Sequence, residues 1–288
     1  MKEQKYITNK IDSFEPKHIF ECGQCFRWTK QTDGSYTGIF CNNVLNVKVN
    51  NNQIIFEGIC ENNIKETVHK YFDLDRDYEK IKNDLSKVDE PLKNSIDYGK
   101  GIRLLNQDLW ETIISFIISA NNNIPRIKGI IERISHKYGN KIIWRDKEYY
   151  TFPTPQQLSK ASVKDLRDLG LGFRDKRVYE TTQIIHTKQI DLKQLENIKE
   201  TEEIRETLLT MPGVGPKVAD CILLFSTLKR LDVFPIDVWV RRVMNELYIK
   251  NENEEKVNNK QIEDLAKHKY GNLAGIAQQY LFYWRMSS

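Results

Sequence analysis

A segment rich in glycine and proline, residues 209–220, constrains the fold of this chain more than any other. It reads LTMPGVGPKVAD. The Pro-Gly-Val-Gly-Pro core cannot continue a helix, because both prolines lack an amide donor and both glycines favour the open conformations of a tight turn. Apolar residues recur at helical spacing on both sides, over residues 203–209 and 218–225. The segment therefore predicts two helices joined by a hairpin.

The second of these helices would begin at the hairpin and place a lysine in its first turn. The amides of Gly213, Gly215 and Val218 would point from a positive helix terminus into open space, which suits a phosphate oxygen. The same helix terminus, together with partial burial, disfavours the charged form of Lys217. An amine in this setting is a candidate nucleophile.

An aspartate opens the next apolar-periodic segment, residues 233–242. Asp237 is placed to cap a helix that follows it. Each feature alone is ordinary, because most lysines at helix starts are solvated and most aspartates at such positions only cap the helix. Lys217 and Asp237 together are far less ordinary.

Composition sets loose limits on function. The 288 residues carry 44 basic and 40 acidic side chains, a net charge of +4 that permits nucleic-acid binding without requiring it. The N-terminal residues lack an apolar signal core, and the most apolar run, residues 113–120, is too short to span a bilayer. Five cysteines, an odd number, favour reduced thiols over a disulfide framework. We expect a cytoplasmic protein, associated with the nucleoid if the cell is bacterial, with no membrane contact.

The periodicity of apolar residues changes once along the chain. Alternating or β-branched residues predict strands over 24–29, 36–40, 45–49 and 54–58. After Cys60 the spacing becomes helical, and we expect helices to continue to the end. The expected class is α+β, with a β-rich domain over 1–98 and a helical region over 99–288, on which residues 1–20 could pack.

Five separated motifs resemble one family in the order that the family shows. They are MPGVGPKVAD at 211–220 with PID at 235–237, GQCFRW at 23–28, NNNIPR at 121–126, LGLGFR at 169–174 and AGIAQQYLF at 274–282. The chain resembles the 8-oxoguanine DNA glycosylases of the helix-hairpin-helix, Gly-Pro-Asp superfamily over nearly its whole length. No cysteine follows Cys221, which excludes the iron–sulfur loop usual in the endonuclease III and adenine-glycosylase branches.

The resemblance implies a bifunctional enzyme that acts on duplex DNA containing 8-oxoguanine. Lys217 would displace the base of an extruded nucleotide at C1′ and form a Schiff base, and β-elimination would then cleave the strand. Asp237 would stabilise the positive charge that develops on the sugar. The resemblance implies no cofactor and no required metal, and we expect a monomer.

The resemblance also assigns a pocket for the base. The backbone carbonyl of Gly23 would accept a hydrogen bond from N7–H, which 8-oxoguanine has and guanine lacks. Gln278 would read the Watson–Crick edge, and Cys221 and Phe282 would sandwich the ring.

A third set of positions would hold the DNA. The resemblance implies that Asn121 fills the space left by the extruded nucleotide, that Phe173 kinks the stack, and that Arg126 and Arg174 contact the opposite base. The carbonyls of Leu209, Met211 and Val214 would hold a structural cation. Many relatives have tyrosine at the position of Phe173 and a phosphate-binding histidine at that of Trp239, so this phosphate contact is absent here or passes to Arg241 or Arg242.

Two other functions fit part of these observations. One is a monofunctional alkyl-base glycosylase that activates water, although such enzymes generally lack a lysine at the position of Lys217. The other is a non-catalytic helix-hairpin-helix module that binds DNA, which would leave Lys217, Asp237 and the base-pocket motif without a role.

Overall fold

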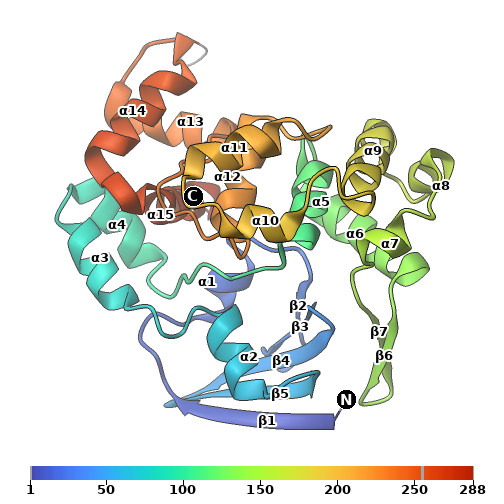
Figure 1. The fold of residues 1–288 in the computed structure, drawn as a ribbon. Coiled ribbons are helices and arrows are strands. Elements are labelled where there is room, and N and C mark those ends of the chain that lie inside the picture. Colours follow the sequence, from blue (N-terminus) through green and yellow to red (C-terminus); the bar gives the residue numbers. More distant parts are fainter. Residues whose placement is uncertain (1, 254–255, 288) are drawn as a thin grey trace.

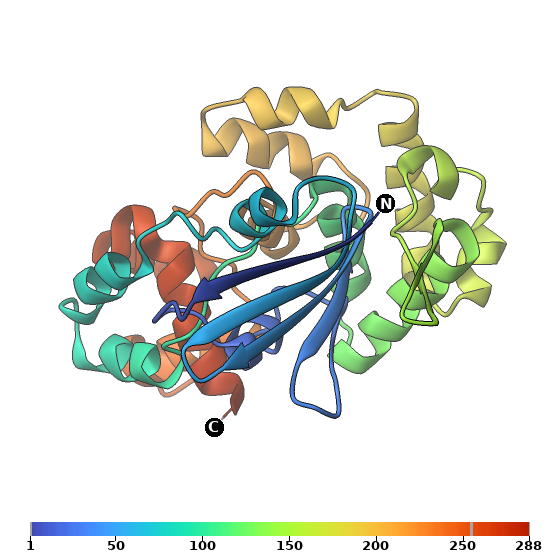
Figure 2. The ribbon, with the colours of Figure 1, turned by 90° about the horizontal axis from the view of Figure 1, so that it is seen from below.

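A five-stranded antiparallel sheet lies along one side of the molecule, and helices cover it (Figures 1 and 2). The computed structural model describes residues 2–253 and 256–287. The strand order is β1-β5-β4-β3-β2. The strands are β1 (Lys2–Asn9), β2 (Trp28–Lys30), β3 (Tyr36–Phe40), β4 (Asn43–Asn50) and β5 (Gln53–Cys60). The expected α+β class is confirmed.

The centre of the sheet is formed by β4 and β5, which pair from Val44–Ile59 to Asn50–Gln53. Their β-branched residues favour the pleated, half-buried surface. Gly58 allows the closest approach, because a Cβ built there would lie 2.0 Å from the carbonyl oxygen of Val44. The edge strand β1 pairs with β5 along its whole length, and sequence analysis predicted no strand there.

Two predictions about secondary structure were wrong. The strand expected over 24–29 begins only at Trp28, because the Gln24 side chain is buried and bonds instead to the carbonyls of Ile19 and Arg103, at 2.9 and 2.8 Å. Helices also do not continue unbroken to the C-terminus. A hairpin of β6 (Lys141–Trp144) and β7 (Lys147–Tyr150) interrupts them, and its two turn residues both have left-handed φ values, 51° and 58°.

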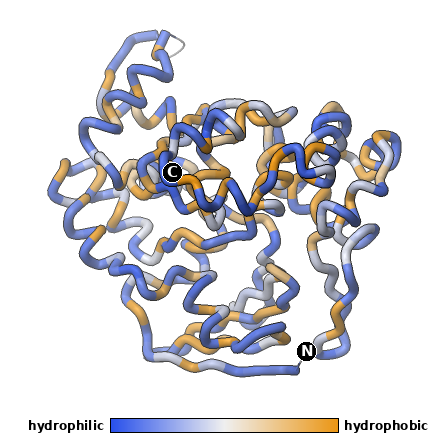
Figure 3. Tube along the Cα trace, in the orientation of Figure 1, coloured by the Kyte–Doolittle hydropathy of each residue, from blue (hydrophilic) through white to orange (hydrophobic). Residues whose placement is uncertain are grey.

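One hydrophobic core lies between the sheet and helices α1 and α2, and the remaining helices surround a second and larger one. Two of them, α5 and α12, are almost entirely buried, and hydrophobic segments run through the middle of the helical layer (Figure 3). None of the described helices is long and apolar enough to cross a membrane. The helices are α1 (Pro16–Phe20), α2 (Ile64–Tyr71), α3 (Tyr78–Ser86), α4 (Glu90–Tyr98), α5 (Leu109–Ser119), α6 (Ile124–Tyr138), α7 (Pro155–Leu158), α8 (Val163–Asp168), α9 (Asp175–His186), α10 (Leu192–Asn197), α11 (Thr201–Leu209), α12 (Pro216–Phe225), α13 (Val238–Met244), α14 (Asn259–Tyr270) and α15 (Ala274–Ser287).

Helices α3 and α4 precede residue 99, yet Leu85, Leu92 and Ile96 pack into the helical core. The first 20 residues are divided in the same way. Strand β1 lies in the sheet, whereas His18 contacts Tyr283 of α15, with 5.4 Å between the ring centres. The first 98 residues therefore contribute to both cores, and the domain division at residue 98 stays a prediction.

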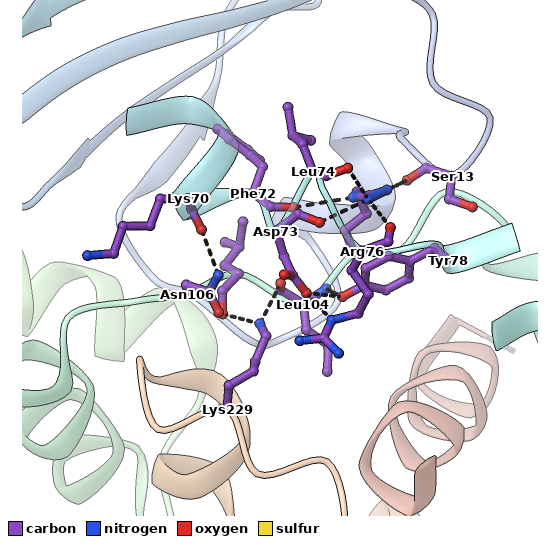
Figure 4. Close-up of polar contacts among 12 residues, drawn as sticks. Ser13, Lys70, Phe72, Asp73, Leu74, Arg76, Tyr78, Leu104, Asn106 and Lys229 are labelled. Carbon is purple, nitrogen blue, oxygen red and sulfur yellow. Dashed lines mark hydrogen bonds and ion pairs between the residues drawn. The ribbon is translucent and has the colours of Figure 1, made fainter. Parts of the chain in front are cut away.

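Two cations, the buried Arg103 and the partly buried Lys229, hold the sheet side to the helical side (Figure 4). Arg103 donates to backbone carbonyls of the turn after α2, including those of Phe72 and Arg76 at 3.2 and 2.9 Å. Lys229, in the loop after α12, donates to the carbonyls of Leu104 and Leu105 at 2.7 and 2.9 Å. Burial lowers the pKa of Lys229 to about 7. The linker before α5 is thereby fixed from both sides.

Candidate active site and DNA-binding surface

The predicted helix-hairpin-helix is present, with α11 ending at Leu209 and α12 beginning at Pro216. Gly213 turns the hairpin with φ of 88°, and a Cβ there would lie 3.0 Å from Ile117 and 3.1 Å from Arg177. The position therefore requires glycine for its backbone conformation and for its space. Thr181 of α9 donates to the carbonyl of Pro212 at 2.9 Å, which ties the hairpin to α9.

Lys217 is the second residue of α12, as predicted, and its Nζ lies 5.4 Å from the centre of the Phe116 ring. The helix that carries it is held against α11 by an ion pair between Arg205 and the buried Asp220. Burial raises the pKa of Asp220 to about 7, and the Arg205 charge opposes that shift. This pair ties the middle of α12 to α11.

Asp237 caps α13, because its Oδ1 accepts a hydrogen bond from the Val240 amide at 2.8 Å. The predicted capping role is confirmed. Asp237 also lines a small pocket together with Lys217. The pocket encloses about 40 Å³, and its lining residues are Cys22, Gly23, Phe116, Lys217, Cys221, Phe225, Pro235, Asp237, Gln278, Gln279 and Phe282.

The four positions predicted to bind a base all lie in this pocket. Gln278 is 4% exposed, and no described residue bonds to its buried Oε1. Gly23 has φ of 83°, and a Cβ there would lie 3.0 Å from the Phe282 ring. Burial raises the pKa of the Cys221 thiol to about 11, so it stays protonated at neutral pH although Lys217 hydrogen-bonds to it. The pocket thus offers a carbonyl edge, an unsatisfied amide and an aromatic face.

Several residues that build the same pocket were not predicted from the sequence. Gln279 donates to the Cys22 carbonyl at 2.6 Å and so fixes the segment that carries Gly23. Phe116 and Phe225 stack with ring centres 5.6 Å apart and form one wall. Phe116 belongs to the apolar stripe of α5, and such a stripe is usually core, so the sequence offers no signal for its second role.

The loop after α5 carries the residue predicted to enter the duplex. Asn121 has φ of 49°, and its carbonyl accepts a hydrogen bond from Arg174 at 2.6 Å. Arg174 is 1% exposed and also donates to the carbonyls of Ala120 and Leu171. Burial lowers the pKa of Arg174, as do the charges of Arg126 and Arg177. The guanidinium holds the loop here, and its predicted contact with the opposite base stays a prediction.

Phe173 and Arg126 lie near this loop with different exposure. Phe173 is 56% exposed, and the Arg174 guanidinium lies 4.2 Å from its ring centre. Arg126 is exposed and donates to the carbonyl of Gly170 at 3.2 Å. Both side chains can therefore meet an external partner.

The first turn of α12 has no side-chain cap. Gly215 is its N-cap residue, and a Cβ there would meet nothing within 4 Å. Val218 is the third residue of the helix, so its amide lies within the first turn and has no acceptor inside the helix. Of the carbonyls predicted to hold a cation, that of Met211 accepts the Val214 amide at 3.0 Å.

A larger cavity, about 640 Å³, shares no lining residue with the Lys217 pocket. It lies between the sheet and the helices and is lined by residues such as Tyr71, Glu111 and Phe152. Within residues 2–253 and 256–287, no group of three or more His, Cys, Asp or Glu side chains could hold a metal ion.

Comparison with known proteins identifies the family of this chain. The 8-oxoguanine DNA glycosylase N-terminal domain matches residues 6–113, and the HhH-GPD superfamily of base excision DNA repair proteins matches residues 114–268. A probable N-glycosylase/DNA lyase of Methanothermobacter thermautotrophicus is 33% identical over 239 residues, which are 76% of this chain and 74% of that protein.

Solved structures extend the similarity to the whole fold. The 8-oxoguanine glycosylase/lyase of Clostridium acetobutylicum in its apo form is 42% identical, covers 98% of both chains and has a TM-score of 0.91. The same enzyme is known in complex with double-stranded DNA that contains cytosine opposite 8-oxoG. A 3-methyladenine DNA glycosylase of Archaeoglobus fulgidus, at 21% identity and a TM-score of 0.78, shares the fold. From its sequence motifs, its fold and these matches, the chain belongs to the HhH-GPD superfamily of base excision DNA repair proteins and to the N-glycosylase/DNA lyases within it.

Proposed function

We propose that this protein excises 8-oxoguanine from duplex DNA and then cleaves the strand at the abasic site. One observation carries the proposal: an amine, a carboxylate and a buried amide acceptor without a partner line the same pocket, as Lys217, Asp237 and Gln278. A module that only binds DNA needs the hairpin and has no use for such a pocket.

The reaction would begin with extrusion of the damaged nucleotide, because C1′ cannot be reached inside the stack. The neutral amine of Lys217 attacks C1′, and the bond from C1′ to the base breaks with its electron pair going to the base, which then takes up a proton. Asp237 stabilises the positive charge on the sugar while that bond breaks. Opening of the sugar ring gives a Schiff base, and β-elimination expels the 3′ phosphate. No cofactor is needed for these steps.

Recognition of the oxidised base would rest on one backbone acceptor. Among the described residues, none donates to the carbonyl of Gly23, so this oxygen can receive the N7–H of 8-oxoguanine. Guanine would present a lone pair to the same oxygen, and an unpaired polar contact in a closed site is strongly rejected. Gln278 would bond to the Watson–Crick edge, with Phe282 and Cys221 against the two faces of the ring.

The DNA itself would be held by the hairpin and by the loop after α5. The uncapped amides at Gly213, Gly215 and Val218 suit a phosphate, with a cation at the carbonyls of Leu209, Met211 and Val214 as a supporting element. Asn121 would fill the gap in the stack, Phe173 would kink it, and the exposed Arg126 would favour cytosine as the opposite base. We also expect the protein to be cytoplasmic and monomeric.

Borohydride trapping on an 8-oxoguanine duplex tests the proposal. The wild-type protein should become covalently attached to DNA, because the reductant converts the Schiff base to a stable amine, and Lys217→Gln should not. Lys164→Gln, which removes an exposed lysine paired with Asp168 at 2.7 Å, is the matched control and should trap normally. Excision without any trapped complex would instead indicate a glycosylase that activates water. Trapping by Lys217→Gln would show that the nucleophile is a different amine.

A further inference from the structure

The larger cavity, about 640 Å³, takes no part in the proposed function. Pockets that bind small molecules usually measure about 300–1,000 Å³, so this one has room for an organic ligand. Segments that are distant in the sequence meet around it, among them α2, the first turn of α5 and α10. The cavity is separate from the Lys217 pocket, with which it shares no lining residue.

Aromatic rings form part of the cavity wall. Phe40 and Tyr71 stack with ring centres 3.9 Å apart, and Trp110 meets Phe152 edge to face at 6.4 Å. The Nε1 of Trp110 already donates to the carbonyl of Pro153 at 2.9 Å. These side chains therefore offer ring surface to a ligand, and ring faces attract cations.

One carboxylate in the wall has no partner. The Asp108 side chain caps α5 by accepting the Glu111 amide at 2.8 Å, and the Glu196 side chain accepts the Thr227 hydroxyl at 2.6 Å. Among the described residues, by contrast, none forms a hydrogen bond or an ion pair with the side-chain oxygens of Glu111. Burial raises the pKa of this carboxyl to about 7. A cationic ligand would supply the missing partner.

The charge of the wall favours a cation as well. Five charged side chains line the cavity, four acidic and one basic: Glu61, Asp108, Glu111, Glu196 and Lys70. Arg27 acts on Glu111 through its charge, but it lies outside the wall and pairs with Glu132 at 3.6 Å. Because no side-chain group in the described part of the chain could hold a metal ion, an organic cation fits better than an inorganic one.

We propose that this cavity binds a planar organic cation, with an amidinium or guanidinium group on the Glu111 carboxylate and a flat body against the aromatic wall. Two parallel N–H donors match the two oxygens of a carboxylate, and such charge-assisted pairs are the strong ones. The inference does not depend on the proposed function, since no catalytic residue lines the cavity.

Benzamidine and benzamide test the proposal, because they differ in charge and hardly in shape. Titration calorimetry on the whole chain without DNA, at about pH 8, keeps the Glu111 carboxyl mostly ionised. The wild type should bind benzamidine roughly tenfold more tightly than benzamide. Glu111→Gln keeps the shape and loses the charge, so the preference should nearly vanish. Glu196→Gln, which changes a carboxylate of the same wall that already has a partner, is the matched control and should keep most of it.

Two further variants locate the bound probe. Thr67 lines the cavity from α2 and is half-buried, so Thr67→Phe should fill the space and weaken benzamidine binding roughly tenfold without changing Glu111. Asp237→Asn removes the carboxylate of the Lys217 pocket and should leave benzamidine binding unchanged. Thermal unfolding of each variant controls for folding, and Thr67→Phe carries the test if Glu111→Gln does not fold.

Three results would overturn the proposal. They are equal affinity of the wild type for the two probes, a preference for benzamidine that survives in Glu111→Gln, and unchanged benzamidine binding in Thr67→Phe. Loss of binding in Asp237→Asn would also overturn it, because the cation would then occupy the Lys217 pocket.

Discussion

Replacement of Arg174 by alanine tests how the loop that carries Asn121 is held. The buried guanidinium makes four hydrogen bonds to three backbone carbonyls, those of Ala120, Asn121 and Leu171. A hydrogen bond from a charged donor contributes about 1.5–3 kcal/mol, and a carbonyl left without its donor is costly unless water reaches it. The loop lies close to the surface and can be rehydrated in part, so we expect a loss of about 3–5 kcal/mol in the free energy of unfolding.

That loss converts to a shift in melting temperature. An entropy of unfolding of about 2.1 cal/mol/K per residue gives about 0.6 kcal/mol/K for 288 residues. The melting temperature should therefore fall by about 5–8 °C in differential scanning calorimetry. Arg174→Lys, which keeps the charge and loses the fork, should fall between the alanine variant and the wild type.

Single-turnover excision supplies the functional part of the same test. If Arg174 acts by positioning Asn121, its loss should slow excision opposite cytosine and opposite adenine by the same factor, because both duplexes need the wedge. A slower rate confined to the cytosine duplex, with an unchanged melting temperature, would refute this reasoning. It would show instead that the guanidinium leaves the loop and contacts the opposite base.

Two further predictions concern buried polar groups. Gln278→Ala should slow excision of 8-oxoguanine roughly 10–100-fold, because a donor on the base loses the Gln278 Oε1 acceptor. Affinity for an abasic duplex, which has no base to bind, should stay nearly unchanged. Equal losses in the excision rate and in this affinity would contradict a role of Gln278 in reading the base. Burial lowers the pKa of Lys229 to about 7 from 10.5, so between these values the unfolded chain binds more protons, and the free energy of unfolding should rise with pH. Urea titrations at about pH 7 and about pH 9.5 should show this rise in the wild type and a smaller rise in Lys229→Met. The charges of Asp73, Arg76 and Arg103 lie nearby and are the same in both proteins. An equal rise in the free energy of unfolding in both proteins would count against a neutral Lys229.

The helix-hairpin-helix could be predicted because its signals are local. Glycine and proline have conformational requirements that do not depend on the rest of the fold, and Asp237 caps α13 through an amide only three residues away. The α+β class followed from a change in apolar period that persists over many residues. These elements are confirmed.

The errors concern segments whose conformation depends on distant partners. β1 is an edge strand with mostly polar residues, and it forms because β5 offers a complete ladder of hydrogen bonds. Gln24 leaves the strand pattern because its side chain satisfies Ile19 and Arg103, the second of which lies 79 residues away. Phe116 reads as core from its spacing, yet it forms a wall of the pocket. Such partners are set by tertiary packing, which periodicity does not report.

The small size of the Lys217 pocket has a consequence for how damaged DNA is searched. A volume of about 40 Å³ has room for a few water molecules, at about 10–15 Å³ for each, and a purine needs more. A flipped base can enter only after the Phe282 ring retreats from Gly23. In the proposed reaction, an undamaged nucleotide would therefore have to displace an aromatic ring before its sugar came within reach of the amine.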